Sequence, residues 1–178
     1  MTKAQHFAAV LRLGDDALVL GQRLSAWCGH GPILEEDIAL SNIALDLIGQ
    51  ARNFFTLAGT LENEGRDEDA LAYFRSDREF QNHLLVEQPN GHFGDTVVRQ
   101  MFFSAFALDR YMFLAHQTVN SDVAGIAASG LERLRVQVWG EVPKLGTTSH
   151  LCIEYAGPRA IMHEQIFFEE SHCFKYCW

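Results

Sequence analysis

The residues of this chain that could do chemistry are best sought by metal-ligand spacing, because long helices often build metal sites from inward carboxylates and imidazoles. A ferritin-like di-iron centre needs a Glu from each of two helices and a Glu-x-x-His motif from each of two others. Residues three apart share a helix face, so a carboxylate can bridge two irons while the imidazole takes an outer position. Residues 1–130 contain no Glu or Asp followed by His three positions later. The sequence therefore predicts no di-iron site in that part of the chain.

One Glu-x-x-His motif occurs near the end of the sequence, at Glu169 and His172, with His163 before it and Cys173 and Cys177 beyond it. On spacing alone this motif would suit a metal ion. It has no second copy to complete a site, and it lies in the segment least like the rest of the chain. Glu169 and His172 are therefore candidates for a metal site in the tail, but not the favoured interpretation.

Two weaker groupings lie in helical sequence. Glu79 and His83 are four residues apart and could meet on a helix face, but one pair cannot hold a di-iron centre. Asp46, Gln50 and Arg52 either form a polar network or face solvent, and structural hydrogen bonding is the expected role. The sequence has no nucleophile elbow, phosphate-binding glycine loop or Cys-x-x-Cys pair. No catalytic or cofactor-binding residue is predicted.

The elements that would position such residues are helices, marked by apolar side chains recurring at alternating steps of four and three. The first such face runs from Leu13 to Trp27, and Gly14, Asp15 and Asp16 suit the first turn of its helix. Two glycines and a proline at 29–32 end this helix, so the next one is expected to run back.

A second long helix begins near Leu34 with three acidic residues, which complement the positive end of the helix dipole. Its inward face runs over 40–61. A charged connection at 62–69 and a shorter helical piece over 71–85 lead to strong turn residues at 88–91.

A third long helix follows, with an apolar face over 94–115. Phe102, Phe106 and Phe113 widen that face and predict a helix buried on more than one side. After Gly130 the pattern changes to mixed strand and turn signals with more aromatic and cysteine residues. We therefore predict an all-α portion over 1–130 and a divergent tail over 131–178.

Composition bounds the class of protein. With 178 residues, 48% hydrophobic and 21% charged, the chain resembles a globular domain rather than a disordered one. A formal charge of -9 without a basic cluster argues against nucleic-acid binding. The sequence shows no signal segment or membrane span, so a cytoplasmic protein is expected. The cysteines do not form a disulfide framework and are expected to be reduced thiols, at Cys28, Cys152, Cys173 and Cys177.

Two segments resemble a known family. The string LRLGDDALVLGQRLSAWCGHGPILEEDIALSNIALDLIGQARNFF over 11–55, and HLLVEQPNGHFGDTVVRQMF over 83–102, are similar to the PaaC family. WCGH, LDLIGQARN and VEQPNG are the distinctive parts, and the resemblance covers residues 11–130. Members of that family are structural subunits of the bacterial phenylacetyl-CoA ring 1,2-epoxidase.

The resemblance implies a ferritin-like helical bundle within a cytoplasmic multicomponent monooxygenase that works in aerobic phenylacetate breakdown. The di-iron centre lies in the catalytic sister subunit, whose second long helix has an Asp followed by a Glu-x-x-His motif. The positions that correspond here are Leu47 and Gln50, which are degenerate as ligands. The resemblance therefore implies a subunit without a cofactor of its own, whose partner is the di-iron subunit.

The chain also departs from this family. Members run longer and stay helical, whereas this sequence turns to VWGEVPKLGTTSHLCIEYAG, so the bundle is expected to be incomplete at the C-terminus. The leading hypothesis is a non-catalytic structural subunit that supports the di-iron catalytic subunit. The alternatives are a metal-binding oxygenase in its own right, or a helical protein that forms a homo-oligomer by self-association.

Overall fold

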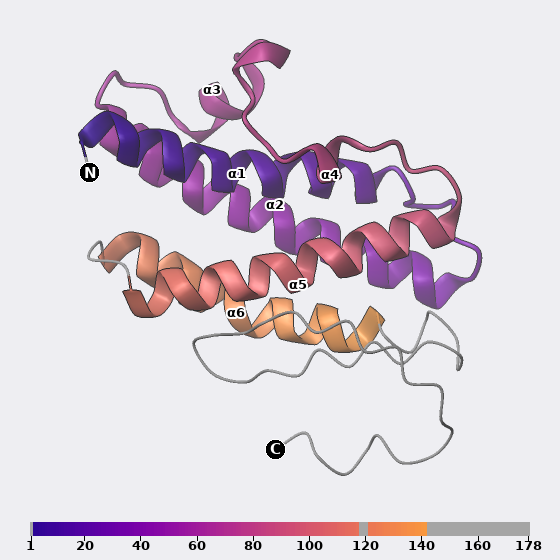
Figure 1. The fold of residues 1–178 in the computed structure, drawn as a ribbon. Coiled ribbons are helices and arrows are strands. Elements are labelled where there is room, and N and C mark those ends of the chain that lie inside the picture. Colours follow the sequence, from indigo (N-terminus) through magenta and orange to yellow (C-terminus); the bar gives the residue numbers. More distant parts are fainter. Residues whose placement is uncertain (1, 118–120, 142–178) are drawn as a thin grey trace.

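The structure is a computed structural model that describes residues 2–117 and 121–141. Helix α1 spans Lys3–Ser25 and helix α2 spans Leu34–Glu62. The two pack along each other over much of their length, connected by the turn that follows Ser25 (Figure 1). A capping box at Thr2 and Gln5 begins α1, since each side chain accepts a hydrogen bond from the other residue's backbone N–H.

A connection of short elements links this first helix pair to the second. It contains α3 (Glu68–Tyr73), a 3-10 turn η1 (Asp77–Glu79) and α4 (Leu84–Glu87). Asn63 ends α2 in the left-handed conformation, with φ of 62°. Helix α3 packs on α2 and α4 packs on α1, so the connection passes over the first helix pair before α5 begins (Figure 1).

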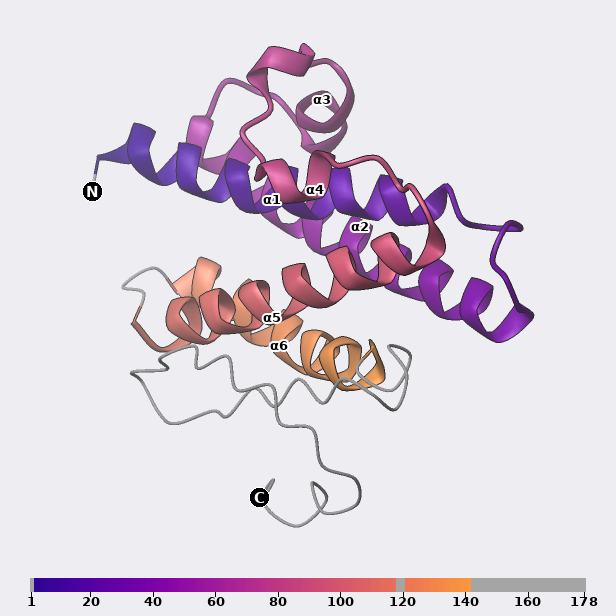
Figure 2. The same ribbon diagram turned by 45° about the vertical axis from the view of Figure 1, so that its right-hand side comes forward.

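The second pair consists of α5 (Phe93–Gln117) and α6 (Ser121–Glu141), which pack along each other below the first pair (Figure 1). Helix α2 contacts α6, and Figure 2 shows the two pairs as adjacent layers. The described residues form helices and no strand, which confirms the predicted all-α, ferritin-like bundle. In the described ranges no helix is long and apolar enough to cross a membrane.

The crossing of α1 and α2 depends on close approach at Gly14. A Cβ atom at this position would lie 2.5 Å from Cε1 of the Phe55 ring, which is well inside van der Waals contact. Phe55 is 2% exposed, so its ring has little room to move away. Glycine at position 14 therefore lets the aromatic ring of α2 lie against the backbone of α1.

Two boundaries differ from those expected. Helix α1 begins at Lys3, so Gly14, Asp15 and Asp16 lie in the middle of the helix and are buried rather than in a first turn. The first-turn prediction was wrong because the apolar residues between Phe7 and Leu11 extend the buried side of α1 towards the N-terminus. Helix α6 continues to Glu141, past residue 131, where the tail was predicted to begin.

The prediction that α5 is buried on more than one side through three phenylalanines was also wrong. Phe102, Phe106 and Phe113 are 46%, 45% and 64% exposed, whereas Phe103 is buried. Helix α5 buries the side that faces α6 and the first helix pair. The three phenylalanines lie on the remaining side, which the described residues leave substantially exposed, although the Phe106 ring contacts His83 and Arg110.

Candidate functional site

The bundle interior around the middle of α2 contains the positions that correspond to metal ligands in the resemblance. Leu47 is fully buried and Gln50 is 4% exposed, so both side chains point into the core. The hydroxyl of Tyr111, on α5, donates a hydrogen bond of 3.2 Å to Oε1 of Gln50. Burial raises the pKa of the Tyr111 phenol well above its ordinary value, which keeps the hydroxyl protonated as a donor.

These side chains do not fit a di-iron centre. Leu47 has no atom that can ligate a metal. The one acceptor oxygen of Gln50 already accepts from Tyr111, and the other end of its amide is a donor. Among the residues that the structure describes, no three His, Cys, Asp or Glu side chains gather as a metal site would require. The interior at this place is packed by an apolar side chain and an amide–phenol hydrogen bond.

The main polar cluster of the described chain surrounds two adjacent carboxylates of α1, Asp15 and Asp16, which are both buried. Asp15 is fully buried and forms an ion pair with Arg75, whose Nη1 lies 3.2 Å from Oδ2 of Asp15. The backbone N–H of Gln81 donates to the same oxygen at 3.0 Å. The Arg75 guanidinium also lies over the Phe80 ring, 4.1 Å from its centroid. Asp15 thus holds both sides of η1 against α1.

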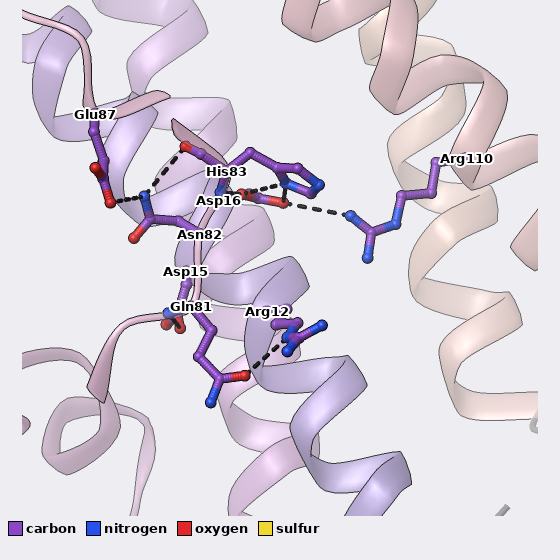
Figure 3. Close-up of polar contacts among 8 residues, drawn as sticks. All are labelled: Arg12, Asp15, Asp16, Gln81, Asn82, His83, Glu87 and Arg110. Atoms are coloured by element: carbon purple, nitrogen blue, oxygen red, sulfur yellow. Dashed lines mark hydrogen bonds and ion pairs between the residues drawn. The ribbon is translucent and has the colours of Figure 1, made fainter. Parts of the chain in front are cut away.

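Asp16, the next residue, faces α4 and α5. Its Oδ1 accepts the backbone N–H of His83 at 2.7 Å, and Nδ1 of the imidazole lies 2.8 Å from its Oδ2. Nη1 of Arg110, on α5, donates to Oδ2 at 3.4 Å. Figure 3 shows the imidazole and the guanidinium approaching this carboxylate from different elements. The His83 ring also meets the Phe106 ring edge-on, with centroids 5.1 Å apart.

The segment from residue 75 to residue 90 is fixed to α1 at further points, and we call this segment the strap. Nε of Arg12 donates to Oε1 of Gln81 at 2.8 Å (Figure 3). Nearer the end of α1, Arg23 donates to the carbonyl of Glu87, and Asn90 donates to the carbonyl of Arg23, both at 2.8 Å. The order of these contacts shows that the strap runs along α1 in the same direction.

The Asp16 carboxylate, the His83 imidazole and the Arg110 guanidinium together resemble a catalytic acid–base group, but the cavity beside them is small. The cavity lined by Asp16, Phe106, Arg110 and Tyr111 has a volume of about 10 Å³. A cavity of that size holds at most about one water molecule. The imidazole of His83 and the guanidinium of Arg110 both bind the Asp16 carboxylate. The contacts of Asp16 therefore bind the strap and α5 to α1.

The candidates from the sequence lie apart from one another. The Glu79 carboxylate accepts hydrogen bonds from the hydroxyl and the backbone N–H of Ser76, both at 2.7 Å, and these bonds lower the pKa of the carboxyl. His83, its predicted partner, binds Asp16 instead. Arg52 pairs with Glu68 at 3.2 Å, while Gln50 contacts Tyr111. The tail candidates lie outside the described residues, and these are Glu169 and His172 with Cys173 and Cys177.

The polar cluster on α1 was not predicted from the sequence. Asp15 and Asp16 were expected in the first turn of a helix. Arg75 and Arg110 belong to no recognisable sequence motif. One signal was present: position 16 lies three residues after Leu13 and four before Leu20, which places it on the apolar face. A carboxylate on that face requires a buried partner, although spacing does not reveal which residue supplies it.

The fold and the packed interior define the class of protein: a ferritin-like helical bundle with Leu47 and Gln50 buried in its core. The profile of the family described as phenylacetic acid catabolic protein matches residues 1–132. The chain belongs to this family.

A curated relative agrees with this assignment. A protein of Escherichia coli strain K12, named as one of the subunits of 1,2-phenylacetyl-CoA epoxidase, is 52% identical over 131 residues. The aligned region covers 74% of this chain and 52% of the relative, so the chain matches about half the length of that protein. The family profile ends at residue 132, close to the place where the sequence departs from the resemblance.

Proposed function

We propose that this chain acts as a non-catalytic structural subunit of a multicomponent phenylacetyl-CoA 1,2-epoxidase. In this role it supports the di-iron catalytic subunit during cytoplasmic, aerobic breakdown of phenylacetate. Membership of the phenylacetic acid catabolic family and the name of the relative support the pathway and the assembly. One structural observation supports the non-catalytic role: Leu47 and the Gln50–Tyr111 hydrogen bond occupy the bundle interior at the degenerate ligand positions.

The proposal assigns no cofactor to this subunit. Packing an apolar side chain and a satisfied amide oxygen into the bundle stabilises the fold but supplies no ligand to a metal. The chemistry would then belong to the partner, and this chain would contribute bundle surface and positioning.

Metal analysis separates this proposal from a self-sufficient oxygenase. The purified full chain would be loaded with iron under anaerobic conditions, desalted, and measured as iron per chain. We expect a value near zero. About two irons per chain, the occupancy of a di-iron bundle, would overturn the proposal. Variants Glu169→Ala and His172→Ala would show whether any bound iron depends on the tail.

Retention by the catalytic subunit tests the supporting role. A tagged di-iron subunit of a phenylacetyl-CoA epoxidase should retain the full chain at micromolar concentrations and should be unable to retain an unrelated helical protein of similar charge. Absence of co-elution under those conditions would count against the proposal, whatever the iron content.

A further inference from the structure

A second apolar stripe runs along α2 beside the side that α2 buries, and Ile48 at its edge also lies close to Gly21 of α1. The side chains of Leu34, Ile38, Leu45 and Ile48 are 71%, 52%, 67% and 38% exposed. Together with two polar positions they recur at alternating steps of four and three, which places them along one side of the helix. We call this set the α2 stripe, and it consists of Leu34, Ile38, Ser41, Leu45, Ile48 and Arg52.

The α2 stripe differs from the scattered apolar residues found on most surfaces. It extends over about five helical turns, or roughly 27 Å. Single exposed apolar residues need no explanation, but an aligned set of them marks an interaction surface. A Cβ atom added at Gly49, beside the stripe, would meet nothing within 4 Å, so another backbone can approach this part of the helix. Figure 2 shows the first turns of α2 extending beyond the ends of α1 and α5.

The spacing of the α2 stripe makes it complementary to itself. In an antiparallel pair related by a two-fold axis near position 43, Ile38 lies opposite Ile48 of the second copy. Ser41 lies opposite Leu45, so a small side chain faces a large one. A closed two-fold contact of this kind uses the same surface on both molecules.

The charges at the two ends of the stripe select the antiparallel direction. The first turn of α2 carries Glu35 and Asp37 beside Leu34, and the far end carries Arg52. Antiparallel pairing brings each Arg52 to the acidic first turn of the other copy. Parallel pairing would instead place Arg52 beside Arg52 and carboxylates beside carboxylates, which is unfavourable. The Arg52 side chain is 73% exposed and its ion pair with Glu68 is a surface pair, so it can be redirected at little cost.

We propose that α2 pairs antiparallel with α2 of a second copy of this chain, through the α2 stripe, to form a two-fold dimer. One helix face buries less than the roughly 800 Å² per partner of a standard interface. The dimer is therefore expected to dissociate on dilution in the micromolar range. The pairing goes beyond the proposed role in an epoxidase and does not depend on the catalytic subunit.

Sedimentation equilibrium of the full 178-residue chain tests the pairing over about 1 to 200 µM, concentrations that bracket a micromolar dissociation constant. We expect a monomer–dimer equilibrium. Leu45→Glu places a charge in the middle of the stripe, at a position exposed enough to leave the monomer folded, and should weaken dimerisation roughly tenfold or more. Phe113→Glu, on α5 and similarly exposed, is the matched control and should leave the equilibrium unchanged.

Charge reversal tests the direction of pairing. Arg52→Glu should weaken the dimer, and adding Glu35→Arg in the same chain should restore it, because the opposite charges again face each other. Glu68→Gln controls for the loss of the ion pair within one chain. Circular dichroism of each variant confirms that the helices are intact.

Three outcomes would overturn the proposal. One is a chain that stays monomeric throughout the concentration range. A second is a dimer that survives Leu45→Glu but is lost with Phe113→Glu, which would place the interface on α5. The third is a monomeric chain whose retention by the catalytic subunit is abolished by Leu45→Glu, which would assign the stripe to that subunit. Retention of the unaltered chain is measured separately, so failure of the dimer and failure of the proposed function are distinguishable.

Discussion

Replacing Arg75 by methionine tests the account of the polar cluster on α1 most directly. The Arg75 and Asp15 side chains are 3% and 0% exposed, so the ion pair is out of contact with water. Arg75→Met removes the cation and leaves the Asp15 carboxylate with the backbone N–H of Gln81 as its remaining donor from the strap. Breaking a buried pair from one side costs about 3–5 kcal/mol, because an uncompensated charge stays buried. We expect a loss of that size in the free energy of unfolding.

The assay is urea unfolding followed by far-ultraviolet circular dichroism, with linear extrapolation to water. Asp15→Asn should cost a comparable amount, and the double variant should cost less than the sum by roughly 2–3 kcal/mol, since the pair can be broken only once. Arg78→Met, an exposed change in the same 3-10 turn, is the control and should stay within about 0.5 kcal/mol. A loss below about 1 kcal/mol for Arg75→Met, typical of surface pairs, or strict additivity in the cycle, would refute the reasoning.

Three further predictions concern the bundle core. Gly14→Ala places a Cβ against the buried Phe55 ring and should destabilise the chain by about 1–3 kcal/mol. Gly125→Ala lies in open space on α6 and should stabilise the chain by roughly 0.5–1 kcal/mol. The denaturant midpoints of the two variants should therefore shift in opposite directions. Tyr111→Phe leaves the buried oxygen of Gln50 without its donor and should cost about 1–3 kcal/mol in the same assay. Burial raises the pKa of the Tyr111 phenol, so this phenol loses its proton in the unfolded chain before it does in the folded chain, and the free energy of unfolding should fall as pH rises above about 10. The fall with pH should be shallower in Tyr111→Phe. Equal slopes in the two proteins would contradict the burial of this phenol.

Much of the bundle could be predicted because its buried faces follow the period of the helix. The expected seam of α2 contains Leu40, Ala44, Leu47 and Ala51, all of which are buried. The burial of Gln50 did not follow, because the sequence left this residue open between a polar network and solvent, although it lies three residues after Leu47 on the same side. Periodicity therefore identified the three long helices α1, α2 and α5 and the buried face of α2.

The remaining features could not be predicted because they depend on contacts between distant residues. The partners of Asp16 come from positions 83 and 110, and helical spacing contains no information about such pairs. The exposure of Phe106 could not be predicted for the same reason. The helical pattern indicates which side of the helix an apolar residue occupies, but not whether another element covers that side. Tertiary packing decided both outcomes.

The strap also sets an order for the assembly of the chain during synthesis. Helices α1 and α2 are joined by a short turn and can pair as soon as both have left the ribosome, because local contacts close quickly. Asp15 and Asp16 must wait, since Arg75 is 60 residues and His83 67 residues further along the chain. Until then the nascent hairpin carries two carboxylates on a surface that is later buried. In the early hairpin, that side of α1 is therefore hydrated. Water is excluded from the two carboxylates only when the strap packs against α1.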